Sequence, residues 1–369
     1  MNHIPLVDLG IQHREIEAEL AEGMTKVFTE TSFILGDEVE RFEREFAAFS
    51  GVSHCVGVAN GTEALELALR AFEIGPGDEV ILPANTFVAT AVAVARAGAT
   101  PVLVDCDPEF HLINPEEVAR RVTAKTKAII PVHLFGQLAP MVALAAISER
   151  TDTILIEDAA QAHGATQNGR PAGSFGMAAG TSFYPGKNLG AYGDAGAVLT
   201  EYAETSERIR QLRNYGSTSK YDHPELGFNS RLDSIQALVL RLKLERLKKW
   251  NDLRSQAANY YRDLLNASSD FQLPRSMEGN EHVWHLFVVK TRRRDEVLEY
   301  LHKHQVGAGI HYPVPLHLQG AFRQLGHKPG DFPISERLAK EMISLPLFPG
   351  ITRDQQERVV EVLLGAVAA

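Results

Sequence analysis

Apolar residues recur every three or four positions near the start of the chain. They form two stripes, which are Ile16, Leu20, Met24, Val27 and Phe28, and then Val39, Phe42, Phe46 and Phe49. Residues three and four apart share one face of a helix. The pattern therefore predicts two amphipathic helices before residue 50.

Between residues 80 and 200 the pattern changes to short β-rich runs, many of them separated by stretches with helical spacing. The runs are Val80–Pro83, Pro101–Val104, Ala128–Val132, Thr153–Ile156, Thr181–Tyr184 and Ala197–Thr200. This alternation predicts an α/β fold, with helices flanking a mostly parallel sheet of buried strands. In such a sheet, ligands bind at the carboxyl ends of the strands.

The last third of the chain has a different texture. An amphipathic stripe over Leu232–Leu242 is followed by a smaller set of expected elements. These are a helix at Ser255–Leu265, a strand at His282–Lys290, a helix around Asp295–His304, a Pro-rich loop at His311–Leu316 and a helix after Thr352. We therefore predict a large domain over residues 1–245 and a smaller C-terminal α+β domain over residues 246–369.

Composition narrows the function classes. The 369 residues carry 37 Lys and Arg against 47 Asp and Glu, a formal net charge of −10 without a long basic run, which argues against a dedicated nucleic-acid binder. Cys55 and Cys106 are far apart, and no histidine spacing suggests a metal site. No signal peptide is evident, and the most apolar window, Phe87–Ala95, is too short for a membrane span. We expect a cytoplasmic protein without membrane contact.

The segment Thr181–Gly190 presents a lysine directly after a turn. Its β-rich run ends at Tyr184, and Pro185-Gly186 is typical of a turn that would expose Lys187. A lysine in a partly desolvated pocket loses its proton more readily and can form a Schiff base with an aldehyde. Most lysines are instead solvated, so this segment alone leaves both interpretations open.

A second segment, Ile154–Gly164, ends an apolar run with two carboxylates, Glu157 and Asp158. At the ligand edge of the sheet, Asp158 could keep a pyridine nitrogen protonated, which makes the ring a better electron sink. It could equally be a helix N-cap or turn residue. Strand alternation predicts that Glu157 points the opposite way.

Two further segments could contact a ligand. Asn60, Gly61 and Thr62 precede an apolar helix, where free amides and the Thr62 hydroxyl would suit a phosphate, although simple capping is compatible with the same residues. Phe87 follows another strand end. It could lie over a flat aromatic ligand or pack in the core.

Together these segments resemble the DegT family of sugar aminotransferases, which have the aspartate-aminotransferase fold. The resemblance runs over nearly the whole chain. It covers Leu35-Gly36 with the following Phe42-Glu43 helix, Asn60–Leu65, Gly75–Asp78, Glu157–Gly164, Ser182–Gly190, Leu212–Gly216, Asn229–Gln236 and His311–Pro315. It implies a pyridoxal 5'-phosphate enzyme, with pyridoxamine 5'-phosphate as intermediate, that moves an amino group from L-glutamate to a nucleotide-linked keto-sugar.

The resemblance also implies roles for matching residues around the cofactor ring. Lys187 would bind the cofactor covalently and move protons. Asp158 would pair with the pyridinium nitrogen, with Gln161 close to the ring. Phe87 would stack on one ring face.

The phosphate contacts follow from the same resemblance. Gly61, Thr62 and Ser182 would hold the phosphate within one subunit. Asn229 would reach the phosphate from a neighbouring subunit. A homodimer with shared active sites is therefore implied.

The sugar-nucleotide cleft would be lined by Tyr184, Lys220, Tyr221, His311 and Tyr312. The flanking segments are most similar to family members that act on dTDP-linked 3-keto-6-deoxyhexoses. A 4-keto sugar or a keto-cyclitol is the alternative acceptor. One branch of the family has histidine in place of the lysine and performs dehydration, and the lysine in this chain speaks against that branch.

Two other classes of function share features with a sugar aminotransferase. A non-catalytic regulator that binds pyridoxal phosphate would share the fold, but no appended helix-turn-helix pattern is present. A nicotinamide oxidoreductase is suggested only by the spacing of Gly190, Gly193 and Gly196. The early strand–GxGxxG–helix unit that such an enzyme needs is not found.

Overall fold

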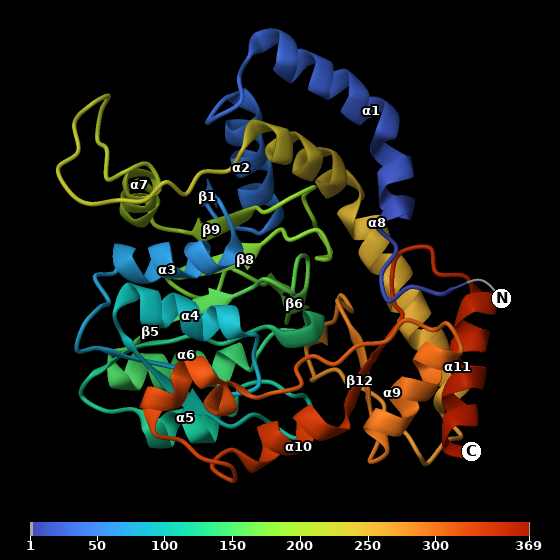
Figure 1. The fold of residues 1–369 in the computed structure, drawn as a ribbon. Coiled ribbons are helices and arrows are strands. Elements are labelled where there is room, and N and C mark those ends of the chain that lie inside the picture. Colours follow the sequence, from blue (N-terminus) through green and yellow to red (C-terminus); the bar gives the residue numbers. More distant parts are fainter. Residues whose placement is uncertain (1–2, 369) are drawn as a thin grey trace.

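Short apolar segments form the central sheet of the molecule, seen in the computed structural model of Figure 1. The structure describes residues 3–368, so Met1, Asn2 and Ala369, at the ends of the two predicted domains, lie outside the described residues. The sheet order is β1-β9-β8-β5-β4-β2-β3. Its strands are β1 (His54–Val58), β2 (Glu79–Pro83), β3 (Thr100–Val104), β4 (Thr126–Ile129), β5 (Ile154–Asp158), β8 (Ala178–Ser182) and β9 (Gly196–Thr200).

The predicted α/β architecture is confirmed. Neighbouring strands from β3 to β8 pair in parallel, and β9 pairs antiparallel with both of its neighbours, β8 and β1. Each of the six predicted β-rich runs overlaps a strand, with ends displaced by a few residues. The strand β1 was not predicted.

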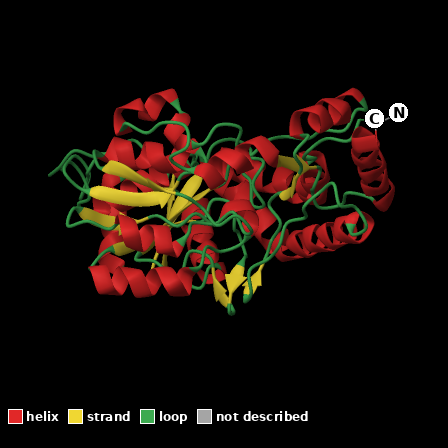
Figure 2. Ribbon diagram, turned by 90° about the horizontal axis from the view of Figure 1, so that it is seen from below, coloured by secondary structure: helices red, strands yellow, loops and turns green. Residues whose placement is uncertain are grey.

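Helices cover both faces of the sheet, as the two views in Figures 1 and 2 show. Val80 and Leu82 of β2 pack in one apolar cluster while Ile81 packs in another, because successive side chains leave a strand on opposite faces. Both faces are buried, which explains the nearly continuous apolar runs. The surrounding helices are α2 (Asp37–Phe49), α3 (Gly61–Ala71), α4 (Val88–Ala97), α5 (Pro115–Arg121), α6 (Met141–Thr151) and α7 (Ala203–Leu212).

One long helix, α8 (Ser234–Leu265), links the larger lobe to the C-terminal lobe. The two separate helices expected at 232–242 and 255–265 are therefore one helix, and that expectation was wrong. Neither glycine nor proline interrupts the segment, and Trp250 and Arg254 in its middle are buried. The predicted division at residue 245 falls inside this helix and stays a prediction.

The C-terminal lobe has its own apolar core around a two-stranded sheet (Figure 2). Tyr261 of α8, Phe287, Leu345 and Leu363 meet in that core. The elements of this lobe are β11 (Phe287–Lys290), α9 (Arg294–Lys303), α10 (Pro333–Glu341), β12 (Met342–Leu345) and α11 (Arg353–Ala368). A small sheet between the lobes has three strands, β6 (Thr166–Gln167), β7 (Arg170–Pro171) and β10 (Asn280–Glu281). Short 3-10 helices occur at Leu134–Gly136, Leu316–Leu318 and Gly320–Leu325.

The first helix, α1 (Leu9–Glu30), lies along α8 at the top of Figure 1. Ile16 and Val27 of the predicted stripe are buried, but Phe28 at its end is 53% exposed. No helix within residues 3–368 has the length and apolar character required to cross a membrane.

Residues 213–233 form a loop that leaves the body between α7 and α8, at the left of Figure 1. Backbone hydrogen bonds close its neck: the Tyr215 amide donates to the Phe228 carbonyl (2.8 Å), and the Phe228 amide donates to the Leu212 carbonyl (2.7 Å). A Cβ on Gly227 would lie 1.9 Å from the backbone nitrogen of Gly216, so only glycine fits there. Backbone hydrogen bonds and a close glycine contact therefore hold the neck together, whereas the tip of the loop is exposed.

Candidate active site

The predicted site residues follow the carboxyl ends of four strands. Gly61 comes after β1, Phe87 after β2 and Lys187 after β8, while Asp158 is the last residue of β5. Because β5 and β8 are parallel neighbours, with Asp158 opposite Gly180, their ends lie at the same edge of the sheet. The fold thus brings residues that are far apart in sequence to one edge.

Asp158 is a buried carboxylate with few partners. Its Oδ2 accepts a hydrogen bond from the Thr90 hydroxyl (2.7 Å), and its Oδ1 accepts one from the Ala160 amide (3.2 Å). Burial raises the pKa of Asp158, while those two hydrogen bonds and the positive charge of Lys187 act in the opposite direction. A cationic ring nitrogen would be a suitable partner for this carboxylate, because it would compensate the cost of burying the charge.

Thr90 was missed by the sequence analysis. It lies on α4, is fully buried, and its hydroxyl is also 3.1 Å from that of Thr86. A threonine in a mostly apolar helix gives no signal of its own, since its partner Asp158 lies on a strand far away in the sequence. The hydrogen bond to Asp158 makes Thr90 a positioning residue.

We expect Thr90→Val to shift the acid limb of the kcat–pH profile to higher pH. The hydroxyl lowers the pKa of Asp158, so its loss raises that pKa, and activity that needs the ionised carboxylate then fails at a higher pH. A hydrogen bond to a charged group is worth about 1.5–3 kcal/mol, which corresponds to a rate loss of roughly 10–100-fold below the new pKa. Thr90→Ser keeps the hydroxyl and is the control. An unmoved acid limb in the valine variant would contradict the assignment.

Lys187 lies in a turn, with its amide donating to the Tyr184 carbonyl (2.8 Å). Desolvation by burial lowers the pKa of Lys187 to about 8, and the negative charge of Asp158 partly opposes this effect. The amine is therefore about half unprotonated at pH 8, where an ordinary lysine would be almost wholly protonated. Nucleophilic attack on an aldehyde requires the unprotonated form.

Three histidines near Lys187 have lowered pKa values. Burial, reinforced by the positive charge of Lys187, lowers the pKa of His163 to about 3 and that of His311 to about 4. Burial likewise places the pKa of His285 well below its usual range. All three rings are neutral at pH 7, so Asp158 is the charged group that faces Lys187.

The first turn of α3 and the end of β8 form a cradle that fits a phosphate. Asn60 caps the helix by accepting from the Glu63 amide (2.9 Å), and within residues 3–368 no protein group accepts from the amides of Gly61 and Thr62. A Cβ on Gly61 would lie 2.5 Å from that of Ser182, so glycine is needed for this close approach. Together with Asp158 and Lys187, these donors match the phosphate, ring nitrogen and aldehyde of pyridoxal phosphate.

An aromatic pair lies beside Asp158. The rings of Phe87 and Tyr312 are 5.1 Å apart, and the Tyr312 hydroxyl accepts from Nε2 of Gln161 (3.1 Å). Gln161 in turn accepts from the Phe135 amide (2.7 Å). Burial, the largest influence, and the charge of Asp158 both raise the pKa of Tyr312 above its usual range. The structure therefore brings Phe87 and Gln161, which were predicted to contact the ring, together with Tyr312, which was predicted to line the sugar-nucleotide cleft.

The remaining predicted residues are distributed unevenly. His311 is close to Lys187, and its Nδ1 lies 2.8 Å from the Ser344 hydroxyl. Tyr184 is exposed at the lysine turn. Lys220, Tyr221 and Asn229 lie in the exposed 213–233 loop, and the structure of the single chain does not bring them to the Lys187 site.

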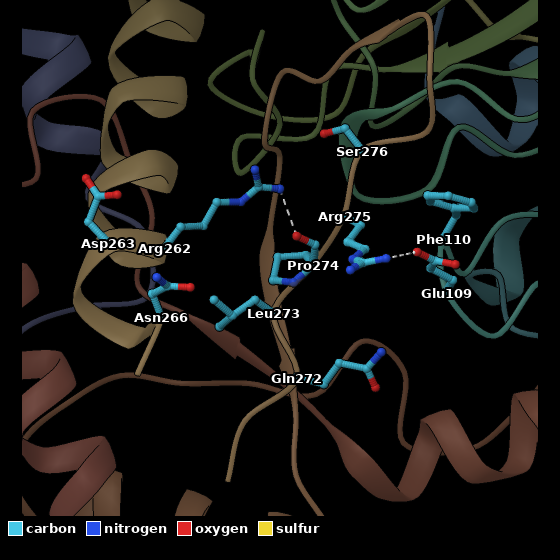
Figure 3. Close-up of a pocket in the computed structure, with 10 residues that line it drawn as sticks. All are labelled: Glu109, Phe110, Arg262, Asp263, Asn266, Gln272, Leu273, Pro274, Arg275 and Ser276. Atoms are coloured by element: carbon cyan, nitrogen blue, oxygen red, sulfur yellow. Dashed lines mark hydrogen bonds and ion pairs between the residues drawn. The ribbon is translucent and has the colours of Figure 1, made fainter. Parts of the chain in front are cut away.

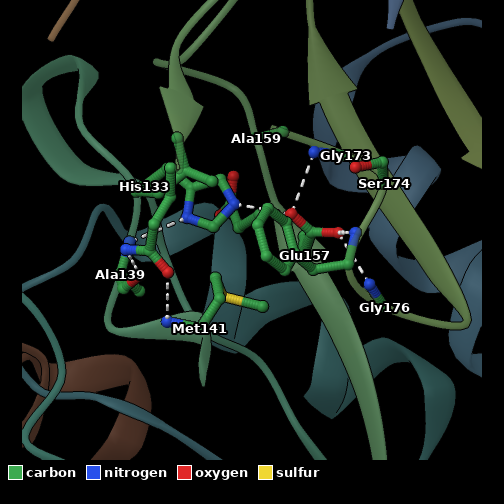
Figure 4. A network of polar contacts seen from close by, with 12 residues as sticks. His133, Ala139, Met141, Glu157, Ala159, Gly173, Ser174 and Gly176 are labelled. Carbon is green, nitrogen blue, oxygen red and sulfur yellow. Dashed lines mark hydrogen bonds and ion pairs between the residues drawn. The ribbon is translucent and has the colours of Figure 1, made fainter. Parts of the chain in front are cut away.

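Glu157 points away from Asp158, as strand alternation predicts, into the network shown in Figure 4. It is fully buried and accepts from Nε2 of His133 (2.8 Å) and from the amides of Gly173 (2.8 Å), Phe175 (2.7 Å) and Gly176 (2.8 Å). The other nitrogen of His133 accepts from the Ala139 amide (3.2 Å), so the ring proton lies on Nε2. Glu157 thus has a structural role behind the site.

We expect Glu157→Ala to destabilise the fold by about 3–5 kcal/mol. The substitution leaves one imidazole N–H and three backbone amides buried without an acceptor, and unpaired buried donors are costly. Urea unfolding of wild type and variant measures the difference. Glu149→Ala, on the surface of α6, is the control. A change below 1 kcal/mol would contradict the role assigned to the network.

A separate cavity of about 750 Å³ lies between α8 and residues 272–276 (Figure 3). Two of its arginines already have partners: Arg262 donates to the Pro274 carbonyl (2.8 Å), and Arg275 pairs with Glu109 (2.6 Å). Its lining contains no lysine, histidine or cysteine and none of the predicted site residues. The candidate chemistry belongs to the edge of the sheet near Lys187.

Comparisons with known proteins agree with this geometry. The sequence profile of the DegT/DnrJ/EryC1/StrS aminotransferase family matches residues 14–364. The chain is 46% identical to a "Pleiotropic regulatory protein" of Geobacillus stearothermophilus, over 97% of each protein. It is 44% identical to dTDP-3-amino-3,4,6-trideoxy-alpha-D-glucose transaminase of Streptomyces venezuelae, over 97% of this chain and 94% of the other.

Two more similarities extend the picture. A UDP-N-acetyl-3-dehydro-alpha-D-glucosamine 3-aminotransferase of Acidithiobacillus ferrooxidans is 45% identical, over 98% of this chain and 97% of the other. Among solved structures, S. venezuelae DesV in complex with a ketimine intermediate superposes with a TM-score of 0.97 at 43% identity, over 99% of each chain.

Proposed function

We propose, from the premise that this chain belongs to the DegT/DnrJ/EryC1/StrS aminotransferase family, that it transfers an amino group to a nucleotide-linked keto-sugar. The observation that carries the proposal is Lys187, an amine with a pKa of about 8 that faces the buried carboxylate of Asp158. Both groups lie beside the amides at the start of α3. This combination suits pyridoxal phosphate, with pyridoxamine phosphate as its aminated form.

The acceptor that we favour is a dTDP-linked 3-keto-6-deoxyhexose. Both named aminotransferase relatives described above act at carbon 3, according to their names, which supports a 3-keto sugar over a 4-keto sugar. The two relatives differ in the nucleotide, dTDP in one and UDP in the other, so the choice of dTDP rests on the sequence resemblance. L-glutamate as the amino donor rests on the same resemblance.

Each catalytic group has a defined task in this proposal. When bound, pyridoxal phosphate supplies an aldehyde that bonds to amines and a ring that takes up electrons from a neighbouring carbon. Asp158 would hold a proton on the ring nitrogen, and the neutral histidines leave this pairing undisturbed. The backbone amides of Gly61 and Thr62, with Ser182, would hold the phosphate and so fix the ring beside Phe87.

Lys187 would move the protons. Its Nζ would remove the proton from the α-carbon of the amino donor and, in the second half of the cycle, deliver a proton to the sugar carbon that receives nitrogen. General acid–base transfer of this kind typically contributes about 10²–10⁴-fold to the rate. A pKa of about 8 allows the same amine to act as base and acid near neutral pH.

The proposal includes a homodimer. Phe28, Phe33 and Ile34 leave an apolar patch, with exposed fractions of 53%, 42% and 49%, at the end of α1 and just beyond it. Exposure of such an apolar patch to water is energetically unfavourable, so the patch suits contact with another protein surface. We propose that a second copy covers it and that Asn229 of each copy reaches the phosphate in the other. The cytoplasmic location also stays a prediction from the sequence.

We expect Phe33→Asp to yield a monomer with strongly reduced cofactor retention. The charge would have to be buried in the dimer contact, and the phosphate would lose Asn229. Light scattering gives the mass, which for wild type should be twice that of the chain. Val142→Asp, an exposed apolar position on α6 far from α1 in Figure 1, is the control and should remain dimeric. A dimeric, active Phe33→Asp variant would refute this contact.

The decisive experiment is a screen of keto-sugar nucleotides. Purified protein would be incubated with L-glutamate and with 3-keto and 4-keto sugars, each linked to dTDP or to UDP. Mass spectrometry would detect the amino-sugar nucleotide together with 2-oxoglutarate. Formation of both products from a dTDP-linked 3-keto sugar is the expected result, and turnover of only 4-keto sugars would overturn the choice of acceptor.

A non-catalytic regulator is the second candidate, and one observation favours it: the relative with 46% identity carries a regulatory name. Asp158 argues for catalysis, since a regulator that only binds pyridoxal phosphate through Lys187 does not need a ring activated by a protonated nitrogen. No turnover of any sugar by protein that retains its cofactor would favour the regulator.

A further inference from the structure

The loop that carries Lys187 is held by the residue that follows it. Asn188 is only 1% exposed. Its Nδ2 donates to Oδ1 of Asn251 (2.9 Å) and to the carbonyl of Val283 (3.0 Å), and its Oδ1 lies 3.1 Å from Nδ1 of His285. One buried side chain thus joins the lysine loop to α8 and to the segment before β11.

The orientation of this amide is fixed by its partners. A carbonyl oxygen can only accept a hydrogen bond, so the NH₂ group of Asn188 must face Val283. Its oxygen then faces His285, whose Nδ1 must carry the ring proton and donate it. Burial keeps the His285 ring neutral, which is consistent with a single ring proton at this position. Both amide protons and the oxygen of Asn188 are therefore engaged.

Helix α8 holds the loop at a second point. Lys243 is 1% exposed, and its Nζ donates to the Gly190 carbonyl (2.7 Å) and lies 4.3 Å from the centre of the Tyr192 ring. Asn251, two helical turns further along α8, also donates to the His163 carbonyl (2.9 Å). The loop is therefore attached to α8 on the C-terminal side of Lys187 at two separate positions, 188 and 190.

We propose that Asn188 is a positioning residue that fixes the backbone of Lys187 and so directs its amine toward Asp158. The inference deepens the proposed function, because it concerns the residue that would hold the cofactor. A buried side chain with three hydrogen bonds to two other segments leaves the adjacent residue little freedom. Without it, the remaining anchors lie at the ends of the loop: the Ala191 amide donates to the Phe183 carbonyl (2.8 Å), and Lys243 donates to the Gly190 carbonyl.

This placement determines the surroundings of the amine. The titratable groups that face Lys187 are Asp158, His163, His285 and His311. Release of the loop would expose Nζ to water, and desolvation is the largest cause of its lowered pKa. The pKa of Lys187 would then rise from about 8 toward the ordinary value of 10.5.

The test measures Lys187 without using catalysis. Competitive labelling with acetic anhydride, applied over a pH series to the full chain freed of cofactor and read by mass spectrometry of the Lys187 peptide, gives the pKa of that amine. In Asn188→Ala we expect the labelling midpoint to rise by at least about one pH unit, with labelling at pH 8 reduced at least about fivefold. Asn188→Leu should act in the same direction, since it keeps nearly the size of the side chain, loses all three hydrogen bonds and adds no charge that would itself raise the pKa of Lys187.

The controls separate positioning from stability. Gln356→Ala removes another buried amide that bonds α8, through the Ala257 carbonyl (2.7 Å), and should leave the Lys187 midpoint unchanged. If the alanine variant of Asn188 does not fold, the leucine variant decides. An unchanged midpoint in a folded Asn188 variant would overturn the proposal. Because the assay needs neither cofactor nor sugar, failure of the sugar screen would leave this result unaffected.

Discussion

Replacement of Lys187 by alanine is expected to remove the visible absorbance of the lysine-bound cofactor and to lower turnover by at least about 10²–10⁴-fold. The variant lacks both the amine that binds the aldehyde and the group that moves protons. No nearby side chain can take over, since His163, His285 and His311 are buried among hydrogen-bonded partners or have strongly lowered pKa values. Absorbance spectra and turnover with glutamate measure the two losses separately.

Lys248→Ala provides the control for this experiment. Its side chain is 86% exposed on α8, and its loss should change neither the spectrum nor the rate. Full transamination by the Lys187→Ala variant would refute the role of Lys187. Retention of the visible band in that variant would show that another amine binds the cofactor.

Replacement of Asp158 by alanine is expected to leave the cofactor bound but nearly inert, with a rate loss of about 10²–10⁴-fold. The phosphate cradle and Lys187 remain, so binding persists, but nothing holds the proton on the ring nitrogen. The carboxylate must be ionised for this task. Burial raises the pKa of Asp158, whereas a cationic ring nitrogen beside it would lower that pKa again. Wild-type kcat should decline as the pH falls through the resulting pKa, and the variant should lack this decline.

The measurements are kcat over a pH series and the cofactor content of the purified variant. Asp252→Asn, at an exposed position on α8, is the matched control and should behave as wild type. Wild-type rates in Asp158→Ala would remove the argument for a protonated ring. Loss of the cofactor instead would mean that Asp158 mainly contributes to binding.

Much of the fold was predictable because apolar spacing is a local property. Short apolar runs predicted the strands β2 to β9 of the central sheet, whereas β1, with the sequence HCVGV, was not predicted. Gly57 interrupts its side-chain pattern, yet the glycine is needed there, since a Cβ would lie 2.8 Å from the Leu232 side chain. That requirement comes from a residue 175 positions away and leaves no local trace.

The candidate site divides in the same way. Asp158 and Lys187 could be predicted because each follows a strand that leads to the ligand edge of the sheet. The hydrogen-bond partners of this strand end could not be predicted. Thr90 contacts Asp158 from helix α4, and His133 contacts Glu157 from the segment after β4. Exposure of Phe28 was also hidden, because a helical stripe shows which face is apolar but not which chain covers it.

The closed neck of the 213–233 loop separates the tip of the loop, which contains Lys220 and Tyr221, from the strands of the candidate active site. Insertions or deletions between Tyr215 and Phe228 would leave the hydrogen bonds of the neck in place. They would not alter the strands that carry Asp158 and Ser182. Loop length is also inexpensive in conformational entropy. If Lys220 and Tyr221 contact the sugar nucleotide, as the family resemblance implies, changes in this one loop would alter the choice of acceptor while the residues around Lys187 stay in place.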